Sequence, residues 1–293
     1  MKILLLGKNG QVGWELQRSL APLGELISHG SDTADLSDLQ ALSAIVRRVA
    51  PDVIVNAAAH TAVDKAESEP ELARAINALA PELLAKEAVR LNALLVHYST
   101  DYVFDGSGNR PWTETDTPSP LSVYGSSKLE GEQLIVQSGC KHLIFRTSWV
   151  YGARGGNFAK TMLRLFAERE VMKVIDDQVG APTGADLLAD VTAHAIRATA
   201  ANADVGGLYH LVAGGETSWH GYASFVLDYA RRAGIPLKVA TIESVPTSAF
   251  PTPASRPLNS RLNTQKLQTT FDLHLPHWQT GVERMLVEIL EKK

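Results

Sequence analysis

The sequence predicts an α/β protein built on a doubly wound parallel sheet, with a smaller lobe formed mainly by the C-terminal half. Short β-rich segments alternate with helical ones through residues 1–150, an order that favours parallel strands covered by helices. The runs Ile3–Leu6 and Val53–Val55 are apolar without interruption, as expected of strands buried on both faces. After Val150, segments rich in glycine and proline separate the helical stretches, which indicates a change of architecture.

Hydrophobic periodicity places the individual elements. Strands are expected at Lys2–Leu6, Glu25–Ser28, Asp52–Asn56, Ala93–Ser99 and His142–Thr147. Helices are expected at Val12–Leu20, Leu39–Val49, Glu71–Val89, Ser126–Gln137, Phe158–Glu168, Leu187–Ala200 and Tyr222–Ala233. Pro81 is expected to split or kink the third of these helices. We expect residues 1–150 to form the first domain, residues 151–293 to form mainly the second lobe, and segments near 174–215 to return to the first.

Composition narrows the class of protein. The 293 residues carry a net charge of −4, and the Lys and Arg residues are scattered along the sequence. This pattern does not indicate a basic surface that would bind nucleic acid or an anionic membrane. The one cysteine, Cys140, excludes an intrachain disulfide and favours a reducing compartment. The apolar run after Lys2 ends at Gly7, which is too short for a secretory or membrane segment. We therefore expect a soluble, cytoplasmic protein without nucleic-acid or membrane partners.

A glycine-rich turn, G-x-x-G-x-x-G, lies between the first expected strand and the first expected helix. Glycine lets backbone N–H groups approach a pyrophosphate, and the N-terminus of the helix adds partial positive charge. The turn therefore predicts a Rossmann-like NAD(P) site, although a tight βα turn without a ligand is the alternative. The expected cofactor contacts in this turn are Gly7, Gly10, Gln11, Val12 and Gly13.

The end of the second strand bears on the choice of cofactor. A carboxylate there normally binds the 2′-hydroxyl of NAD, but no acidic residue follows Ser28 until Asp32. Lys8 and His29 are instead suited to a 2′-phosphate, so we expect NADPH to be accepted, with NADH left open. Further cofactor contacts are expected at Asp35, Leu36, Ala58 and Ala59.

Tyr124 and Lys128 form a candidate catalytic pair. They are four residues apart at the start of an expected helix, which places both on one face. The spacing alone is a weak signal, since a surface pair on a helix would look the same. Its position after the glycine-rich turn and beyond Thr100, which follows the preceding strand, strengthens the interpretation because open α/β sheets bind ligands at the carboxyl ends of their strands.

These three residues supply what the reduction of a ketone requires. A cofactor delivers hydride to carbon, and the oxygen needs a proton. We expect the ammonium of Lys128 to lower the pKa of the Tyr124 phenol toward working pH. Thr100 is expected to hydrogen-bond the same carbonyl oxygen and orient it.

Longer strings of the sequence resemble the extended short-chain dehydrogenases, and among them the dTDP-4-dehydrorhamnose reductase family. The similarity covers essentially the whole chain and is far more specific than the glycine triplet. It is carried by Gly7–Leu16, Asn56–Glu67, Tyr98–Phe104, Tyr124-Gly125 with Lys128, Arg146–Tyr151, Asn157–Met162, Arg256-Pro257 and Asn259–Leu262.

The resemblance implies an NAD(P)H-dependent reduction of the C4 keto group of dTDP-4-dehydro-β-L-rhamnose to dTDP-L-rhamnose, the last step of dTDP-rhamnose biosynthesis. It implies that Tyr124, Lys128 and Thr61 also contact the cofactor. It further implies a sugar pocket lined by Thr61, Val63, Thr100, Asp101 and Trp149, with Asn157 and Arg256 at the nucleotide end. Trp149 is equally open to a packing role, and Arg256 to a solvated position.

Some members of this family are thought to be dimers that hold Mg²⁺ through carboxylates. A homodimer is therefore possible here. Glu15, Asp186 and Glu288 are the residues that would bind such a metal, but exposed carboxylates on helices are usually only solvated, so no metal is assigned.

Three other functions share this fold. A sugar-nucleotide dehydratase commonly needs an adjacent Asp-Glu after the threonine, whereas this chain reads Thr100-Asp101-Tyr102. An epimerase uses the same tyrosine and lysine, holds NAD tightly and consumes no reductant. A non-catalytic NAD(P)-binding regulatory subunit would not need the intact set of Thr100, Tyr124 and Lys128.

Overall fold

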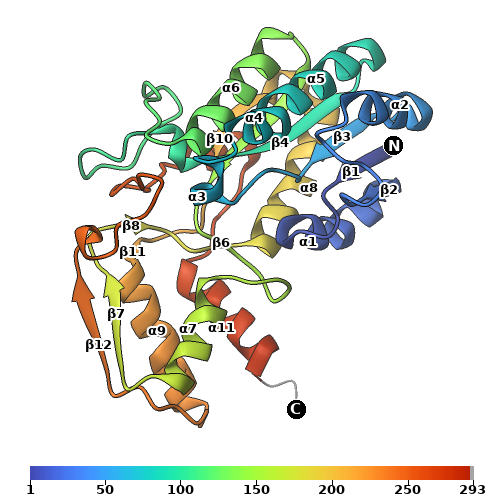
Figure 1. Cartoon of the computed structure of the whole chain (residues 1–293). Coiled ribbons are helices and arrows are strands. Elements are labelled where there is room, and N and C mark those ends of the chain that lie inside the picture. Colours follow the sequence, from blue (N-terminus) through green and yellow to red (C-terminus); the bar gives the residue numbers. More distant parts are fainter. Residues whose placement is uncertain (291–293) are drawn as a thin grey trace.

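A large body built on one sheet and a smaller lobe beside it make up the molecule (Figure 1). This computed structural model describes residues 1–290, so residues 291–293 of the expected C-terminal lobe lie outside the described part. No helix within residues 1–290 is both long and apolar enough to cross a membrane.

The central sheet has six strands, and all neighbouring strands run parallel. In spatial order they are β10 (Gly207–His210), β5 (Lys141–Thr147), β4 (Leu94–Thr100), β3 (Val53–Asn56), β1 (Lys2–Leu6) and β2 (Glu25–His29). The chain runs outward from β1 to β2 and then resumes on the other side of β1 at β3. This reversal creates the crevice at which such sheets bind ligands. The predicted Rossmann-like parallel sheet is confirmed.

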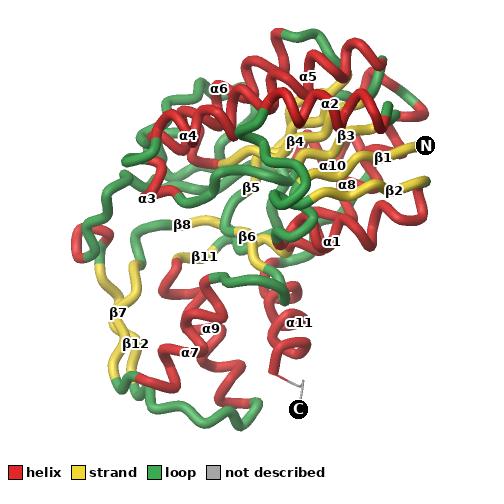
Figure 2. The backbone as a smooth tube through the Cα atoms, turned by 45° about the vertical axis from the view of Figure 1, so that its right-hand side comes forward, coloured by secondary structure: helices red, strands yellow, loops and turns green. Residues whose placement is uncertain are grey.

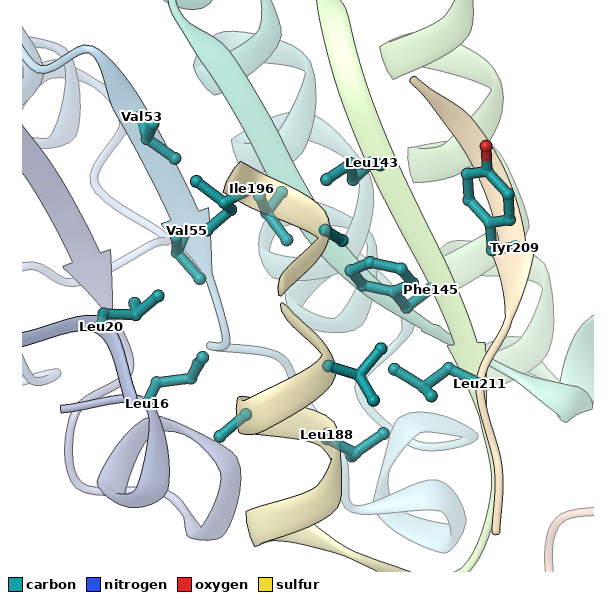
Figure 3. Packing of buried hydrophobic residues seen from close by; sticks show 14 of the residues in the cluster. Leu16, Leu20, Val53, Val55, Leu143, Phe145, Leu188, Ile196, Tyr209 and Leu211 are labelled. Atoms are coloured by element: carbon teal, nitrogen blue, oxygen red, sulfur yellow. The ribbon is translucent and has the colours of Figure 1, made fainter. Parts of the chain in front are cut away.

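Helices cover both faces of the sheet (Figures 1 and 2). One face packs against α1 (Gln11–Leu20), α8 (Ala185–Ala201) and α10 (Gln265–Phe271), and the other against α2 (Leu39–Val49), α5 (Ala80–Leu91) and α6 (Val123–Gln137). Figure 3 shows the first of these cores, with side chains of the strands meeting those of α1 and α8. Along β1, Ile3 and Leu5 enter one core and Leu4 and Leu6 the other, which explains its unbroken apolar sequence.

The expected helix over Glu71–Val89 is interrupted, as its proline suggested, but the interruption is a distinct structure. The chain forms α3 (Val63–Ala66), α4 (Pro70–Arg74), a π-helical turn at Ala75–Leu79 and then α5. Pro81 lies in the first turn of α5, directly after the π-helical turn, whose wider ladder accommodates a residue without an N–H to donate. The widened turn before it carries Asn77 against α6.

The smaller lobe has its own apolar core. It contains α7 (Phe158–Glu168), β7 (Val171–Ile175), α9 (Trp219–Arg232), β12 (Thr241–Val245) and α11 (Trp278–Leu290). Two further strand pairs, β6 (Val150–Tyr151) with β9 (Thr183–Gly184) and β8 (Val179–Gly180) with β11 (Thr217–Ser218), lie near the body. Because β10 and α8 belong to the sheet and its cover, the chain crosses between the two units more than once.

A buried ion pair fixes α6 to the sheet. Arg146 on β5 donates from Nε to Glu132 Oε1 at 2.9 Å and from Nη2 to Glu132 Oε2 at 2.6 Å. Both side chains are at most 5% exposed, and the Arg146 guanidinium also lies 5.0 Å from the centroid of the Phe104 ring. Two parallel hydrogen bonds of this kind set the orientation of the helix as well as its distance.

The glycine-rich turn is shaped by close backbone contacts. Gly7 has a φ of 87°, and a Cβ placed on it would lie 2.7 Å from the backbone nitrogen of Ala58. A Cβ on Gly13 would lie 2.0 Å from the Gly7 carbonyl oxygen, whereas on Gly10 the nearest atom would be 3.5 Å away. Gly7 and Gly13 are therefore required by the packing of the turn itself, and the fold leaves room for a side chain only at Gly10.

We expect Glu132→Leu to lower the free energy of unfolding by about 3 to 5 kcal/mol, because it leaves the Arg146 charge buried without its partner. Chemical denaturation measures this loss. Glu168→Gln is the matched control, since the Arg164–Glu168 pair is exposed and its loss should change stability by less than about 1 kcal/mol. Equal effects of the two substitutions would contradict a structural role for the buried pair.

We also expect Gly13→Ala to lower the free energy of unfolding by about 1 to 3 kcal/mol, because the added methyl overlaps the Gly7 carbonyl. Gly10→Ala should leave the unfolding transition of the protein without ligand nearly unchanged. Both variants are compared by denaturation without cofactor. A Gly10→Ala protein as unstable as Gly13→Ala would contradict the open space beside Gly10.

Candidate active site

The carboxyl end of β4 brings the first candidate residue to the edge of the sheet. Thr100 is the last residue of β4 and is 5% exposed. Its hydroxyl oxygen accepts from the Tyr102 backbone N–H at 3.2 Å and donates to Asp101 Oδ1 at 3.1 Å. The hydroxyl also interacts with the phenol of Tyr124. Thr100 is thus held in place by the short 3₁₀ turn that follows it.

Tyr124 lies in the first turn of α6. Helix α6 begins three residues earlier than expected, because the Ser122 hydroxyl caps it by accepting from the Gly125 N–H at 3.1 Å. The Tyr124 ring packs edge-to-face with Tyr102, with centroids 5.5 Å apart. Burial raises the pKa of the phenol to about 12, and hydrogen bonding with Thr100 opposes that rise.

Lys128 follows one helical turn later and is only 2% exposed. Its Nζ donates to the Tyr98 carbonyl oxygen at 2.6 Å and lies 3.2 Å from His97 Nε2. Burial lowers the pKa of this lysine to about 8, and the carboxylate of Glu132 opposes the shift. The structure therefore brings Thr100, Tyr124 and Lys128 to one end of the sheet.

The expected effect of Lys128 on the Tyr124 phenol needs correction. The sequence suggested that a neighbouring ammonium lowers the pKa of the phenol, but here that pKa is raised. The reason is physical: burial disfavours the phenolate, and the shift comes from burial, Thr100 and Asp101. Lys128 Nζ donates instead to the Tyr98 carbonyl oxygen and lies beside the His97 ring.

Asp101 is a buried acid beside this group. Burial raises its pKa to about 6, and hydrogen bonds from Ser260 and Thr100 oppose the rise. Its Oδ2 is buried and has no hydrogen-bond partner among residues 1–290. A buried oxygen without a partner is rare and suits a ligand hydroxyl. Ser260 appeared in the sequence only as part of a resembling string, because its contact with Asp101 joins segments far apart in the chain.

The expected cofactor contacts fall into two groups. Gly7, Gly10, Gly13 and Gln11 lie in the turn between β1 and α1, with Ala58 directly opposite Gly7. The other expected contacts differ in how far they are exposed. Val12 packs on the core beneath α1, Leu36 is buried in the other core, Ala59 is partly exposed, and Asp35 and Thr61 are exposed. Two hydrogen bonds from Ser37 lower the pKa of the Asp35 carboxyl.

Basic groups gather at the end of β2. The pKa of His29 is lowered by burial and by the positive charges of Lys8 and Arg48, while Asp32 opposes the shift. Arg48, on α2, was not recognised in the sequence because 40 residues separate it from the turn that carries Lys8. Asp32 folds back over Gly30: its Oδ1 would be 2.6 Å from a Cβ at that glycine.

Trp149 has an unusual backbone. It follows β5 with a φ of 50°, a conformation that bulky residues rarely adopt. Its indole stacks on Trp219, with ring centroids 3.7 Å apart and planes 15° from parallel. Trp219 in turn donates from Nε1 to Gln178 Oε1 at 3.0 Å. Trp149 thus has packing partners in the smaller lobe, and its contact with a sugar stays a prediction.

Arg256 and Asn157 are both engaged with protein groups. Arg256 Nη2 donates to Asp64 Oδ2 at 2.8 Å, which ties the proline-rich loop to α3 beside Val63. Asn157 Nδ2 donates to the Gly152 carbonyl at 2.7 Å and to Gln11 Oε1 at 3.3 Å. Asn157 therefore lies against the glycine-rich turn, and the contact of either residue with a nucleotide stays a prediction.

The three carboxylates considered for a metal share one cavity, of about 560 Å³, lined by residues of α1, α8 and α11 among others. Asp186 in this cavity pairs with Arg284 Nη1 at 3.2 Å. Within the part of the chain that the structure describes, no three His, Cys, Asp or Glu side chains are grouped as metal ligands. Metal binding by Glu15, Asp186 and Glu288 therefore stays unassigned. Thr100, Tyr124 and Lys128 do not line this cavity.

Comparison with known proteins connects this geometry to a family. The family model described as "RmlD substrate binding domain" matches residues 1–291. The dTDP-4-dehydrorhamnose reductase of Salmonella typhimurium is 62% identical over 293 residues, covering 99% of this chain and 98% of that protein. The protein of the same name from Escherichia coli K12 is 60% identical with the same coverage.

Solved structures of related proteins have the same fold as this chain. A dTDP-4-dehydrorhamnose reductase from Bacillus anthracis, crystallised in complex with NADP, has a TM-score of 0.89 at 35% identity and covers 98% of this chain and 99% of its own. A UDP-glucose 4-epimerase from Thermus thermophilus has a TM-score of 0.80, covering 100% of this chain and 99% of its own; its 19% identity shows the fold alone. This chain therefore belongs to the dTDP-4-dehydrorhamnose reductase family, a group of NAD(P)H-dependent oxidoreductases.

Proposed function

We propose that this protein reduces the C4 keto group of dTDP-4-dehydro-β-L-rhamnose to give dTDP-L-rhamnose, with NADPH or NADH as reductant. This reaction is the last step of dTDP-rhamnose biosynthesis. The observation that carries the proposal is the convergence of Thr100, Tyr124 and Lys128 at the carboxyl end of β4, in a chain about 60% identical to reductases named for this substrate.

The residues at the site suit proton delivery to a developing alkoxide. The cofactor supplies hydride when bound. The raised pKa of Tyr124 keeps the phenol protonated at neutral pH, as a proton donor in a reduction must be. We assign to Thr100 a hydrogen bond to the oxygen that receives the proton, for which its hydroxyl proton turns away from Asp101 Oδ1. The pKa of Lys128 is lowered to about 8, so this lysine gives up a proton more readily than an ordinary lysine and can reprotonate Tyr124.

Binding roles follow from the same geometry. We assign the cofactor to the turn between β1 and α1 and to the small residues after β3. Gly10 supports this assignment, because the packing of the turn does not require a glycine there and the space beside it is open. We assign the sugar to the region of Thr61, Val63, Thr100, Asp101 and Trp149. The free Oδ2 of Asp101 is an acceptor for a sugar hydroxyl. Asn157 and Arg256 are assigned to the nucleotide end.

Organisation and location complete the proposal. We assign NAD(P) binding to residues 1–150 with the later segments that pack on the sheet, and substrate binding mainly to the rest of 151–293. The single, buried Cys140 suits a reducing compartment, so we place the enzyme in the cytoplasm. We also propose a homodimer, because Trp14 on α1 is 45% exposed beside a cavity with charges of both signs.

The reaction itself separates this proposal from its alternatives. Incubating the protein with dTDP-4-dehydrorhamnose and each reduced cofactor should consume the cofactor and give a product identifiable by NMR as dTDP-L-rhamnose. An epimerase would convert its substrate without consuming cofactor, and a regulatory subunit would bind the cofactor and convert nothing.

Tyr124→Phe should lower kcat at least about a hundredfold, because it removes the proton donor and leaves the ring. Binding of NADPH, measured by fluorescence or calorimetry, should change little. Tyr209→Phe is the control: it removes a hydroxyl that donates to the Val205 carbonyl at the edge of the sheet, so activity should persist. Near-normal turnover of Tyr124→Phe would remove this residue from its assigned role.

Arg48→Ala should raise the KM for NADPH about tenfold and leave the KM for NADH nearly unchanged, because a 2′-phosphate loses a charged partner. Lys8→Ala should act in the same direction. Arg47→Ala is a matched control on the same helix, since the Arg47 guanidinium is paired with Glu87 at 2.6 Å. A wild-type protein with a strong preference for NADH would overturn this assignment of the basic groups.

A further inference from the structure

A buried histidine, His97, lies behind the active site and contacts the catalytic lysine. His97 is in the middle of β4 and is 1% exposed. Its Nε2 lies 3.2 Å from Lys128 Nζ, and its Nδ1 lies 3.2 Å from Asn56 Nδ2. Asn56 is the register partner of His97 on β3 and is also 1% exposed. Three buried polar groups thus form a chain that ends at the catalytic lysine.

The amide of Asn56 has a fixed orientation. Its Oδ1 accepts from the backbone N–H of Ala58 at 3.2 Å. Turning the amide over would place its NH₂ group against that N–H, so two donors would face each other. Asn56 therefore directs its NH₂ group toward His97, and Nδ1 of the ring must accept.

This orientation determines the tautomer of His97. Burial and the neighbouring Lys128 lower the pKa of the imidazole well below its usual value, so the ring is neutral and carries a single proton. Because Nδ1 accepts from Asn56, that proton is on Nε2. The Nε2–H bond then points toward Lys128 Nζ.

The tautomer has a consequence for Lys128. An ammonium has only donors, so it gains nothing from an N–H that faces it. A neutral amine has a lone pair that can accept from Nε2–H while one of its own hydrogens remains on the Tyr98 carbonyl. The contact with His97 therefore stabilises the amine and disfavours the ammonium.

We propose that His97 is a positioning residue for the reduction: held by Asn56 as its Nε2–H tautomer, it donates to Lys128 and favours the uncharged form of that lysine. In the proposed reaction Tyr124 gives its proton to the substrate oxygen in every turnover and must be protonated again. Lys128 then returns a proton: an N–H bond of the ammonium breaks, the O–H bond of Tyr124 forms, and the resulting amine accepts from His97. Solvent protonates the amine before the next cycle.

Few charged groups lie near the buried row formed by Asn56, His97 and Lys128. Lys128 is the charged group that shifts the pKa of His97, and Glu132 is the one that acts on Lys128. The charge of Glu132 is balanced by the guanidinium of Arg146 on β5, which donates three hydrogen bonds to it. On the β3 side the ring contacts the uncharged Asn56. Among residues 1–290, no carboxylate contacts either ring nitrogen to hold an imidazolium.

The first experiment tests the tautomer directly and needs no substrate. Two-bond ¹H–¹⁵N spectra of the full chain distinguish a protonated from an unprotonated ring nitrogen, and the His97 signals are assigned by their loss in His97→Gln. We expect protonated Nε2 and unprotonated Nδ1 in wild type. In Asn56→Asp the carboxylate accepts from the ring, so we expect the proton to move to Nδ1. Protonated Nδ1 in the wild-type protein would overturn the proposal.

The second experiment measures the consequence for Lys128. In wild type the rate of reduction, as kcat/KM for the keto sugar, should fall as pH rises through about 8, because Lys128 loses its proton. In Asn56→Asp the ring nitrogen facing Lys128 becomes an acceptor and stabilises the ammonium, so this limb should move up by about one pH unit or more. His194→Gln, at an exposed position on α8, should leave the limb in place.

These readouts also separate this inference from the proposed function on which it rests. If the protein does not reduce dTDP-4-dehydrorhamnose, the proposed function fails, and the tautomer measurement still decides the state of His97. If reduction proceeds but the pH limb is the same in Asn56→Asp and wild type, His97 does not tune Lys128 and the inference fails. Should His97→Gln not fold, the His97 signals are assigned by their shift in the isosteric Asn56→Asp variant, which then gives both readouts.

Discussion

The close packing of α6 against the sheet is the constraint on which the active site depends, because this one helix carries both Tyr124 and Lys128. A Cβ on Gly131 would lie 2.1 Å from the Asn77 carbonyl, so the helix touches the π-helical turn backbone to backbone. On the other side the Glu132–Arg146 pair ties it to β5. With both contacts in place, the first two turns of α6 have little freedom to move away from Thr100.

That packing also sets the chemistry, because it buries Lys128 and leaves Tyr124 only partly exposed. Burial favours the neutral form of each group, so it raises the pKa of the phenol to about 12 and lowers that of the lysine to about 8. These shifts bring the pKa of the lysine closer to neutral pH and keep the phenol fully protonated there. A reductase needs this order: its donor must hold the proton until hydride arrives, and a less basic neighbour must then restore it.

Local patterns predicted much of the body of the protein. All five expected strands are found within one residue of their predicted ends, because each has an apolar centre bounded by polar or turn residues. The glycine turn and the Tyr124–Lys128 spacing were equally visible. Strands β7 and β12 were not predicted, since they are half exposed and pair with each other across 70 residues. The pKa of Tyr124 was predicted in the wrong direction, because the extent of burial cannot be read from spacing.

His97 and Asn56 show what a sequence pattern conceals. Each interrupts or ends an apolar strand at a buried position, where an unpaired polar group is costly and an aliphatic side chain would pack at no such cost. Only the register of β3 against β4 reveals that the two are opposite each other and that Lys128 completes the chain. Burying Asn56, His97 and Lys128 in an otherwise apolar layer costs more free energy than filling the same space with aliphatic side chains. A role in controlling the protonation of the lysine accounts for retaining them there, and it explains why the polar chain ends at that residue.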